Sequence, residues 1–178
     1  MTSIALSDSD ILGALSKLNI KARVVEFKDI CAVKTADELF SEGAVVVYIG
    51  VEPGFGHWAC AWLKKGQVHT FDSSGHALDQ DLLEISPATR AELHETSPCL
   101  MDLLLDPRRC PYPVVVSGWP LQACKPGINT CGRWVIARLQ HADLSDDQFH
   151  ALLEKSKTSP GESFDTAVVA LTHGLLGK

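Results

Sequence analysis

A chain of 178 residues is long enough to form one domain with a substantial hydrophobic core. Its composition, 46% hydrophobic and 21% charged, is ordinary for a globular protein, and its net charge of −6 argues against general nucleic-acid binding, which requires clustered Lys and Arg. No apolar run approaches the length of a membrane span, and no basic stretch precedes the apolar residues near the N-terminus. We therefore expect neither membrane insertion nor a secretory signal peptide.

The first part of the chain is predicted to be mainly helical. A helix is expected after a cap at Ser7 or Asp8, because the apolar residues that follow recur at helical spacing. The stretch "ARVVEF", residues 22–27, is a possible short strand or connector. The stretch "TADELFSEG", residues 35–43, predicts a short helix that ends at Gly43.

Strand signals follow. The run "AVVVYIG", residues 44–50, is apolar and β-branched, as in a buried strand. Residues 57–63 and 67–72 are separated by a Lys-Lys-Gly turn and predict an antiparallel hairpin. Residues 79–105 read as helical with a break near Pro98, and Val114–Ser117 as an edge strand bounded by prolines.

Three helices are predicted nearer the C-terminus, beginning near Cys131, after a cap at Ser145 and near Glu162. The pattern predicts an α+β fold, in which a central mixed or antiparallel sheet of about four or five strands is flanked by helices. We expect a single domain, residues 1–178. It would comprise an N-terminal helical segment (1–43), a core that carries the chemistry (44–142) and C-terminal helices (143–178).

The six cysteines are Cys31, Cys60, Cys99, Cys110, Cys124 and Cys131. None forms a CxxC pair, so neither a zinc ribbon nor a redox dithiol is expected. Because no signal peptide is expected either, we predict that all six are free thiols and that most are buried. No metal ion is predicted.

The segment "INTCGRWVIARL", residues 128–139, places Cys131 at the start of a predicted amphipathic helix. A helix N-terminus carries positive partial charge and unpaired N–H groups, which favour a thiolate and can face a developing oxyanion. Gly132 has no side chain to block approach to the sulfur. Cys131 is therefore a candidate nucleophile, although a lone cysteine at this position is more often a buried packing residue.

Three further side chains complete a possible catalytic set. His57 follows the glycine-rich turn "EPGFG" at the start of a strand and is favoured over His76 as a general base. Asp72 ends the paired strand and can orient the imidazole, although "DSSG" also suits a simple turn. Gln122, in the loop before Cys131, can donate an amide N–H to an oxyanion, or be a solvated loop residue.

The ordered set "GHW", "FDSSG", "LQ" and "NTCGRW" resembles the adenovirus-protease (adenain) and SUMO-protease clan of cysteine peptidases. The resemblance implies an adenain-like fold and these roles: His57 as general base, Asp72 as its orienting acid, Gln122 in the oxyanion hole and Cys131 as nucleophile. Trp58 matches the aromatic residue that follows the base. One departure is that Gln122 lies nine residues before Cys131, a longer gap than the clan leads us to expect.

Within the clan, the chain most resembles the adenain-type maturation proteases of DNA viruses, virophages and Polinton-type elements. This implies a cysteine endopeptidase that processes capsid precursor proteins during virion maturation, in the infected host cell or the virion. Trp58 and Gly132 are expected to contact substrate. Adenain uses an activating peptide and DNA, but no residue here carries that property over. We therefore expect no cofactor, no nucleic acid or membrane partner, and a monomer.

Other interpretations remain open. An isopeptidase that removes ubiquitin or SUMO would use the same chemistry with a different substrate surface. A non-catalytic relative that only binds protein would be expected to lose the nucleophile or the base, whereas this chain keeps both. A metal site is disfavoured because His57, His69 and His76 are irregularly spaced and no cysteine pair completes the set.

Overall fold

The computed structural model describes residues 4–77 and 79–176. The outermost residues of the predicted domain, 1–3 and 177–178, lie outside the described residues, as does Leu78, directly before the predicted helical stretch 79–105. The division of the chain into three parts stays a prediction. The segment predicted to be helical, 1–43, contributes a strand as well as helices.

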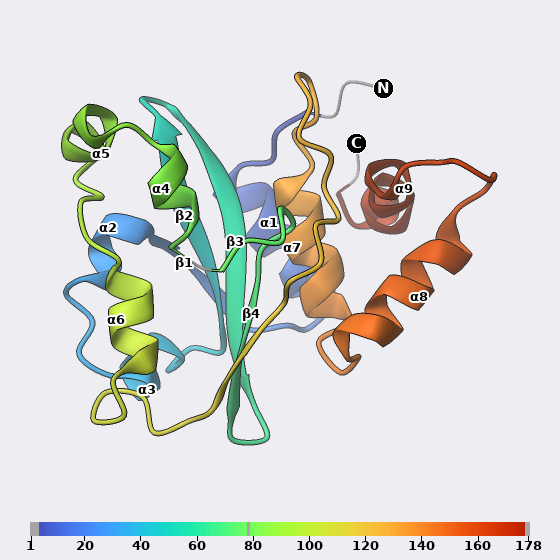
Figure 1. Cartoon of the computed structure of the whole chain (residues 1–178). Helices are drawn as coiled ribbons and strands as arrows, with labels where there is room; N and C mark the ends of the chain where they lie inside the picture. Colours follow the sequence, from blue (N-terminus) through green and yellow to red (C-terminus); the bar gives the residue numbers. More distant parts are fainter. Residues whose placement is uncertain (1–3, 78, 177–178) are drawn as a thin grey trace.

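A five-stranded mixed sheet runs through the middle of the described structure (Figure 1). The strands follow one another across the sheet in chain order: β1 (Ala22–Glu26), β2 (Ala44–Glu52), β3 (Phe55–Lys64), β4 (Gln67–Phe71) and β5 (Val114–Val116). The inner pairs, β2–β3 and β3–β4, are antiparallel, whereas both edge strands pair in parallel. The α+β fold with a mixed sheet flanked by helices is thus as predicted.

Helices cover both faces of the sheet (Figure 1). They are α1 (Asp8–Lys17), α2 (Phe27–Ile30), α3 (Ala36–Leu39), α4 (Asp81–Glu84), α5 (Pro87–Leu93), α6 (Cys99–Leu105), α7 (Cys131–Gln140), α8 (Asp146–Ser156) and α9 (Phe164–Leu176). One core lies between the sheet and α1, α7 and α8, with α9 packed on α7; the other lies under α2 to α6. Over the described ranges, no helix has both the length and the apolar character that a membrane crossing requires.

Local signals account for where the longer helices begin. Ser7 caps α1 and Ser145 caps α8, each by a reciprocal pair of bonds with the residue three positions on. The last helix begins at Phe164, two residues after the predicted start near Glu162. The predicted helix that ends at Gly43 stops at Leu39, because the chain turns back toward β2 and Gly43 adopts a positive φ of 112° there.

The prediction that all six cysteines are free thiols is wrong for two of them. Cys31, at the end of α2, and Cys99, at the start of α6, form a disulfide, with Cα atoms 4.9 Å apart. The pairing depends on helices that pack together beneath the sheet although the residues lie 68 positions apart. The other four, among the residues described, are free: Cys60, Cys110, Cys124 and Cys131.

Candidate active site

The β3–β4 hairpin brings His57 and Asp72 together. His57 lies near the start of β3 and Asp72 directly follows β4, so both lie at the same end of the antiparallel pair. Asp72 Oδ1 lies 3.0 Å from His57 Nε2, and its side chain is fully buried. Asp72 therefore holds one ring nitrogen of His57 and leaves Nδ1 to face elsewhere.

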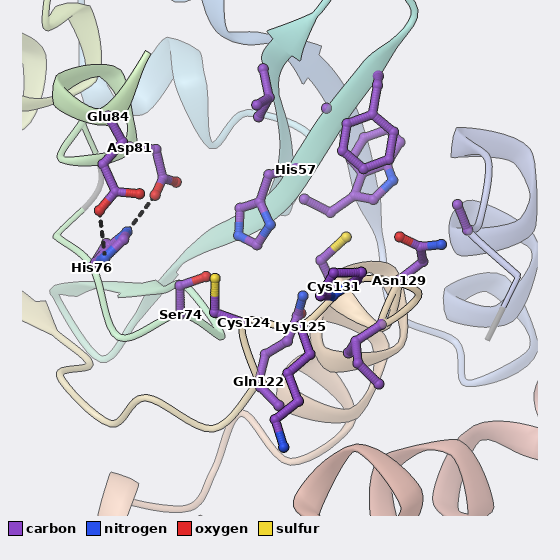
Figure 2. A pocket seen from close by; sticks show the side chains of 18 of the residues that line it. His57, Ser74, His76, Asp81, Glu84, Gln122, Cys124, Lys125, Asn129 and Cys131 are labelled. Carbon is purple, nitrogen blue, oxygen red and sulfur yellow. Dashed lines mark hydrogen bonds and ion pairs between the residues drawn. The ribbon is translucent and has the colours of Figure 1, made fainter. Parts of the chain in front are cut away.

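Cys131 is the first residue of α7 and meets His57 from the opposite side (Figure 2). The two side chains point toward one another, one from the sheet and one from the helix N-terminus. Burial by itself lowers the pKa of His57, but hydrogen bonds with Asp72 and Cys131, and the negative charge of both, raise that pKa well above 6.5. These surroundings favour the protonated form of the ring, so His57 can accept and hold the proton of the Cys131 thiol.

The pair lies in a cleft of about 700 Å³, a volume within the usual range for ligand sites. The sheet side of the cleft includes Phe55 and Trp58, and the opposite side is the loop from Pro120 to Asn129. Cys131 lines this cleft although the residue is only 8% exposed.

Gln122 lines this cleft, on the same loop that leads to Cys131 (Figure 2). The buried Ser73 fixes it in two ways: the Ser73 hydroxyl donates to Gln122 Oε1 (2.9 Å), and the Gln122 N–H donates to the Ser73 carbonyl (2.9 Å). Because the amide oxygen is used in this way, the amide –NH₂ group is the end that can donate to a substrate. The long gap to Cys131 therefore does not remove Gln122 from the site.

Gly75 explains how the loop approaches the hairpin so closely. It has a φ of 79°, and a Cβ at this position would lie 2.8 Å from the backbone nitrogen of Pro120. Only glycine combines this conformation with so close a backbone contact. The turn after Asp72 and the segment that leads to Gln122 are therefore in direct contact.

Of the two residues expected to contact substrate, Trp58 lines the cleft and Gly132 does not. The indole N–H of Trp58 donates to the Leu6 carbonyl (3.0 Å), which fixes the ring. A Cβ at Gly132 would lie 3.0 Å from Leu6 Cβ and 3.1 Å from Ile11 Cδ1, so Gly132 allows the close packing of the N-terminal segment on α7. The structure does not bring Gly132 to the substrate side.

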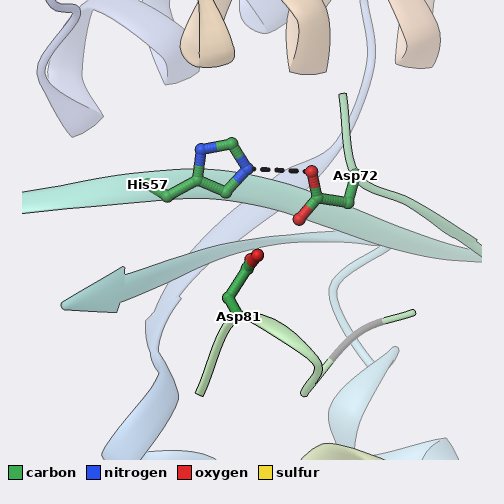
Figure 3. A group of neighbouring side chains, drawn as sticks. All are labelled: His57, Asp72 and Asp81. Carbon is green, nitrogen blue, oxygen red and sulfur yellow. Dashed lines mark hydrogen bonds and ion pairs between the residues drawn. The ribbon is translucent and has the colours of Figure 1, made fainter. Parts of the chain in front are cut away.

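No sequence motif indicated a second carboxyl group behind Asp72. Asp81, at the start of α4, points its carboxyl group toward that of Asp72 (Figure 3). On its other side, Asp81 Oδ1 lies 2.5 Å from Nδ1 of His76, and His76 Nε2 lies 3.5 Å from a Glu84 oxygen. His76, the weaker candidate for a general base, therefore belongs to this outer group and not to the pair with Cys131.

The charges of the two carboxyl groups are strongly linked. Burial and the adjacent charge and hydrogen bond of Asp72 raise the pKa of Asp81 to about 6. Burial raises the pKa of Asp72, but its hydrogen bond with His57, together with the charge of His57, outweighs burial and lowers it. At mildly acidic pH Asp72 therefore carries the negative charge, while Asp81 is largely protonated.

Within the part of the chain described, one set of side chains has donor atoms close enough to hold a metal ion. It consists of His57, Asp72 and Asp81, whose donor atoms lie within 4.8 Å of one another. The hydrogen bond from His57 to Asp72 and the raised pKa of Asp81 already explain this closeness. A metal ion is therefore not required to account for the arrangement, and binding one would occupy the ring nitrogen that Asp72 holds.

No protein-family model matches the chain. The uncharacterised protein V9 of Sputnik virophage is 30% identical over 145 residues, which are 79% of this chain and 79% of V9. A solved structure of the SUMO protease Ulp1, with its catalytic cysteine oxidised to a sulfinic acid, is 14% identical with a TM-score of 0.36, over 96% of this chain and 79% of that one. A score this low is no basis for a shared fold or activity.

Proposed function

The chain belongs to the same family as the Sputnik virophage protein V9, and from the geometry of its cleft we propose that it is a cysteine endopeptidase. The observation that carries the proposal is the position of His57 between Asp72 and Cys131. A base held by a carboxylate on one side and facing a thiol at a helix N-terminus on the other is the arrangement that activates a cysteine nucleophile.

In this mechanism His57 Nδ1 takes the proton of the Cys131 thiol, and Asp72 stabilises the resulting imidazolium. The thiolate attacks the scissile carbonyl carbon, a C–S bond forms, and the carbonyl electron pair moves to the oxygen. The Gln122 amide and the Cys131 backbone N–H stabilise this oxyanion, each by about 3–4 kcal/mol. His57 then protonates the leaving amine as the C–N bond breaks, and water attack releases the acyl group from the sulfur.

The proposed substrates are capsid precursor proteins, cleaved during virion maturation in the infected cell or the virion. The observation that supports this choice is that the family includes a virophage protein. Small residues next to the cut, such as glycine, are what the resemblance to the clan implies. Trp58 would form part of the wall that holds the substrate chain.

Competition between two cysteines of the same cleft tests whether Cys131 is activated. Cys124 is exposed and Cys131 is nearly buried, so accessibility alone predicts that Cys124 reacts first with iodoacetamide. We expect the opposite order, at least about tenfold in favour of Cys131 near neutral pH, because the thiolate is the reactive form. The substitution His57→Ala should reverse the order. Peptide mapping after sub-stoichiometric labelling measures it, and faster labelling of Cys124 in the unmodified protein would refute the activation.

The reaction itself is tested with a peptide library that contains glycine sites. Cys131→Ala should abolish cleavage, whereas Cys124→Ser should leave most of it intact. Vinyl-sulfone derivatives of ubiquitin and SUMO serve as a second measurement. Rapid capture of such a probe by Cys131 without cleavage of any peptide would instead indicate an isopeptidase.

A further inference from the structure

A buried carboxylate on α9, Asp165, accepts three hydrogen bonds from the segment that carries the proposed oxyanion site. Its Oδ2 accepts the backbone N–H of Ala123 (2.9 Å). Its Oδ1 accepts the hydroxyl of Thr130 (2.5 Å) and the indole N–H of Trp134 (3.1 Å). Asp165 is 4% exposed and is not used by the mechanism described above.

The positions of these donors along the chain are informative. Ala123 directly follows Gln122, and Thr130 directly precedes Cys131. The carboxylate therefore binds both ends of the eight-residue loop, 123–130, that separates the two oxyanion donors. Trp134, one turn further along α7 and fully buried, fixes the same carboxylate to the helix that begins with Cys131.

Thr130 supports this reading because it does not use its side chain as a helix cap. It occupies the N-cap position of α7, where a threonine hydroxyl commonly accepts an N–H of the first turn, but here no such bond forms. The hydroxyl donates to Asp165 instead. The Thr130 hydroxyl is thus committed to Asp165 on α9 and not to the first turn of α7.

We propose that Asp165 is a positioning residue for the oxyanion site, which sets the distance between the Gln122 amide and the Cys131 backbone N–H by holding both ends of the intervening loop. The proposal rests on the proposed function. The competing explanation is that Asp165 only attaches α9 to the core, in which case its loss would disturb Cys131 and Gln122 without distinction.

The substitution Asp165→Asn separates the two ends of the loop. Its remaining oxygen can still accept from Thr130 and Trp134, but its –NH₂ group would face the N–H of Ala123, so the Gln122 side is released. We expect kcat for a glycine-containing peptide to fall about 10- to 100-fold with little change in KM, because an oxyanion donor acts mainly in the transition state. Asp146→Asn is the matched control, since Asp146 binds Arg138 on α7 outside the cleft.

A double-mutant cycle identifies the route of the effect. If Asp165 acts through Gln122, the variant Asp165→Asn/Gln122→Ala should be no slower than Gln122→Ala alone. Fully multiplicative losses in the double variant would overturn the proposal.

Two reactions of Cys131 that need no peptide cleavage complete the test. Alkylation by iodoacetamide forms a C–S bond, expels iodide and creates no oxyanion, so Asp165→Asn should alkylate within about twofold of the unmodified protein. A peptide ending in glycinal adds to the thiolate, and its carbonyl oxygen becomes an oxyanion in the adduct, so its affinity should fall about tenfold or more in the variant. Equal losses in alkylation and aldehyde binding would show a merely structural role and overturn the proposal.

The same reactions keep the two proposals apart. If the unmodified protein binds the aldehyde in a manner dependent on Gln122 and Asp165 but cleaves no peptide, the endopeptidase is refuted and the positioning role is supported. If it neither binds the aldehyde at Cys131 nor cleaves peptides, both are refuted.

Discussion

His57 lies in an electrostatic field set by two carboxyl groups. Asp72 contacts the ring directly, and Asp81 acts on it through Asp72. Because the pKa of Asp81 is about 6, the second carboxyl group is largely neutral below this pH and largely ionised above it. Ionisation of Asp81 adds a negative charge near the imidazolium and so strengthens the hold of His57 on its proton.

The substitution Asp81→Asn should therefore move the alkaline limb of the pH profile to lower pH. An asparagine stays neutral and donates a permanent hydrogen bond to Asp72, and both effects lower the pKa of His57. A peptidase that uses an imidazolium loses activity as His57 deprotonates, so kcat/KM should begin to fall at a lower pH, by about half to one unit. The pH dependence of kcat/KM and an NMR titration of the His57 ring measure the shift.

Glu84→Gln provides the control for this prediction. Glu84 belongs to the same helix and contacts His76, but it is not among the groups that shift the pKa of Asp72 or Asp81. It should leave the alkaline limb almost unchanged. An unaltered limb in Asp81→Asn, or an equal shift in both variants, would argue against coupling through Asp72.

Residues joined by local geometry could be predicted, and those joined only by helix packing could not. A hairpin brings the ends of its strands together, so the meeting of His57 and Asp72 follows from the strand pattern alone. Asp81 and Asp165 reach the site because α4 and α9 pack beside it, and neither lies in a recognisable motif. The placement of Gln122 could be expected only from the family resemblance, since its contact with Ser73 depends on the folded loop.

At the scale of elements, the contact between α1 and α7 helps to position the helix that begins with Cys131. Gly132 lies in this contact, where an added Cβ would meet Leu6 and Ile11 at 3.0–3.1 Å. Gly13, in the middle of α1, has no atom within 4 Å of the position of such a Cβ. The same substitution to alanine would therefore add a Cβ in a crowded place at Gly132 and in open space at Gly13.

We predict opposite effects of alanine at these two positions. Gly13→Ala should raise the free energy of unfolding by about 0.5–1 kcal/mol, because alanine restricts the unfolded chain and favours helix. Gly132→Ala should lower it by about 1–3 kcal/mol through overpacking against buried neighbours, despite the same gain in helix propensity. Urea unfolding followed by circular dichroism measures both. A stabilising Gly132→Ala would mean that α1 can move away from α7 at little cost.

Elements with their own start signals were predictable from sequence, and this explains the agreement for α1 and α8. Their serine caps and apolar spacing are local properties of the chain. The segment 22–27 could not be assigned, because β1 becomes a strand by parallel pairing with β2, whose position depends on the intervening α2 and α3. The stretch 79–105 divides into α4, α5 and α6: the gap before α6 contains Pro98, near which a break was predicted, whereas the gap between α4 and α5 was not predicted.

At the scale of the whole molecule, the fold class follows from the number and order of the strands and helices, whereas long-range covalent links do not. The disulfide joins α2 to α6 and closes a loop that contains β2, β3 and β4, and with them His57 and Asp72. Local spacing indicates no pairing between cysteines 68 positions apart. The cross-link therefore closes the segment of chain that carries His57 and Asp72, whereas Cys131 lies outside it.

Removing this link should lower stability without disabling the site. In the chain-entropy model, a cross-link that closes a loop of this length raises the free energy of the unfolded chain by about 4 kcal/mol. The free energy of unfolding of Cys31→Ala/Cys99→Ala should therefore be lower by a comparable amount. Cys110→Ala, a buried free cysteine under the same sheet face, controls for lost packing. Unfolded without reductant, the protein should show four reactive thiols, and six after reduction. Six thiols in both conditions would disprove the link, while Cys131 alkylation at the unmodified rate in the folded double variant would show that the active site forms without it.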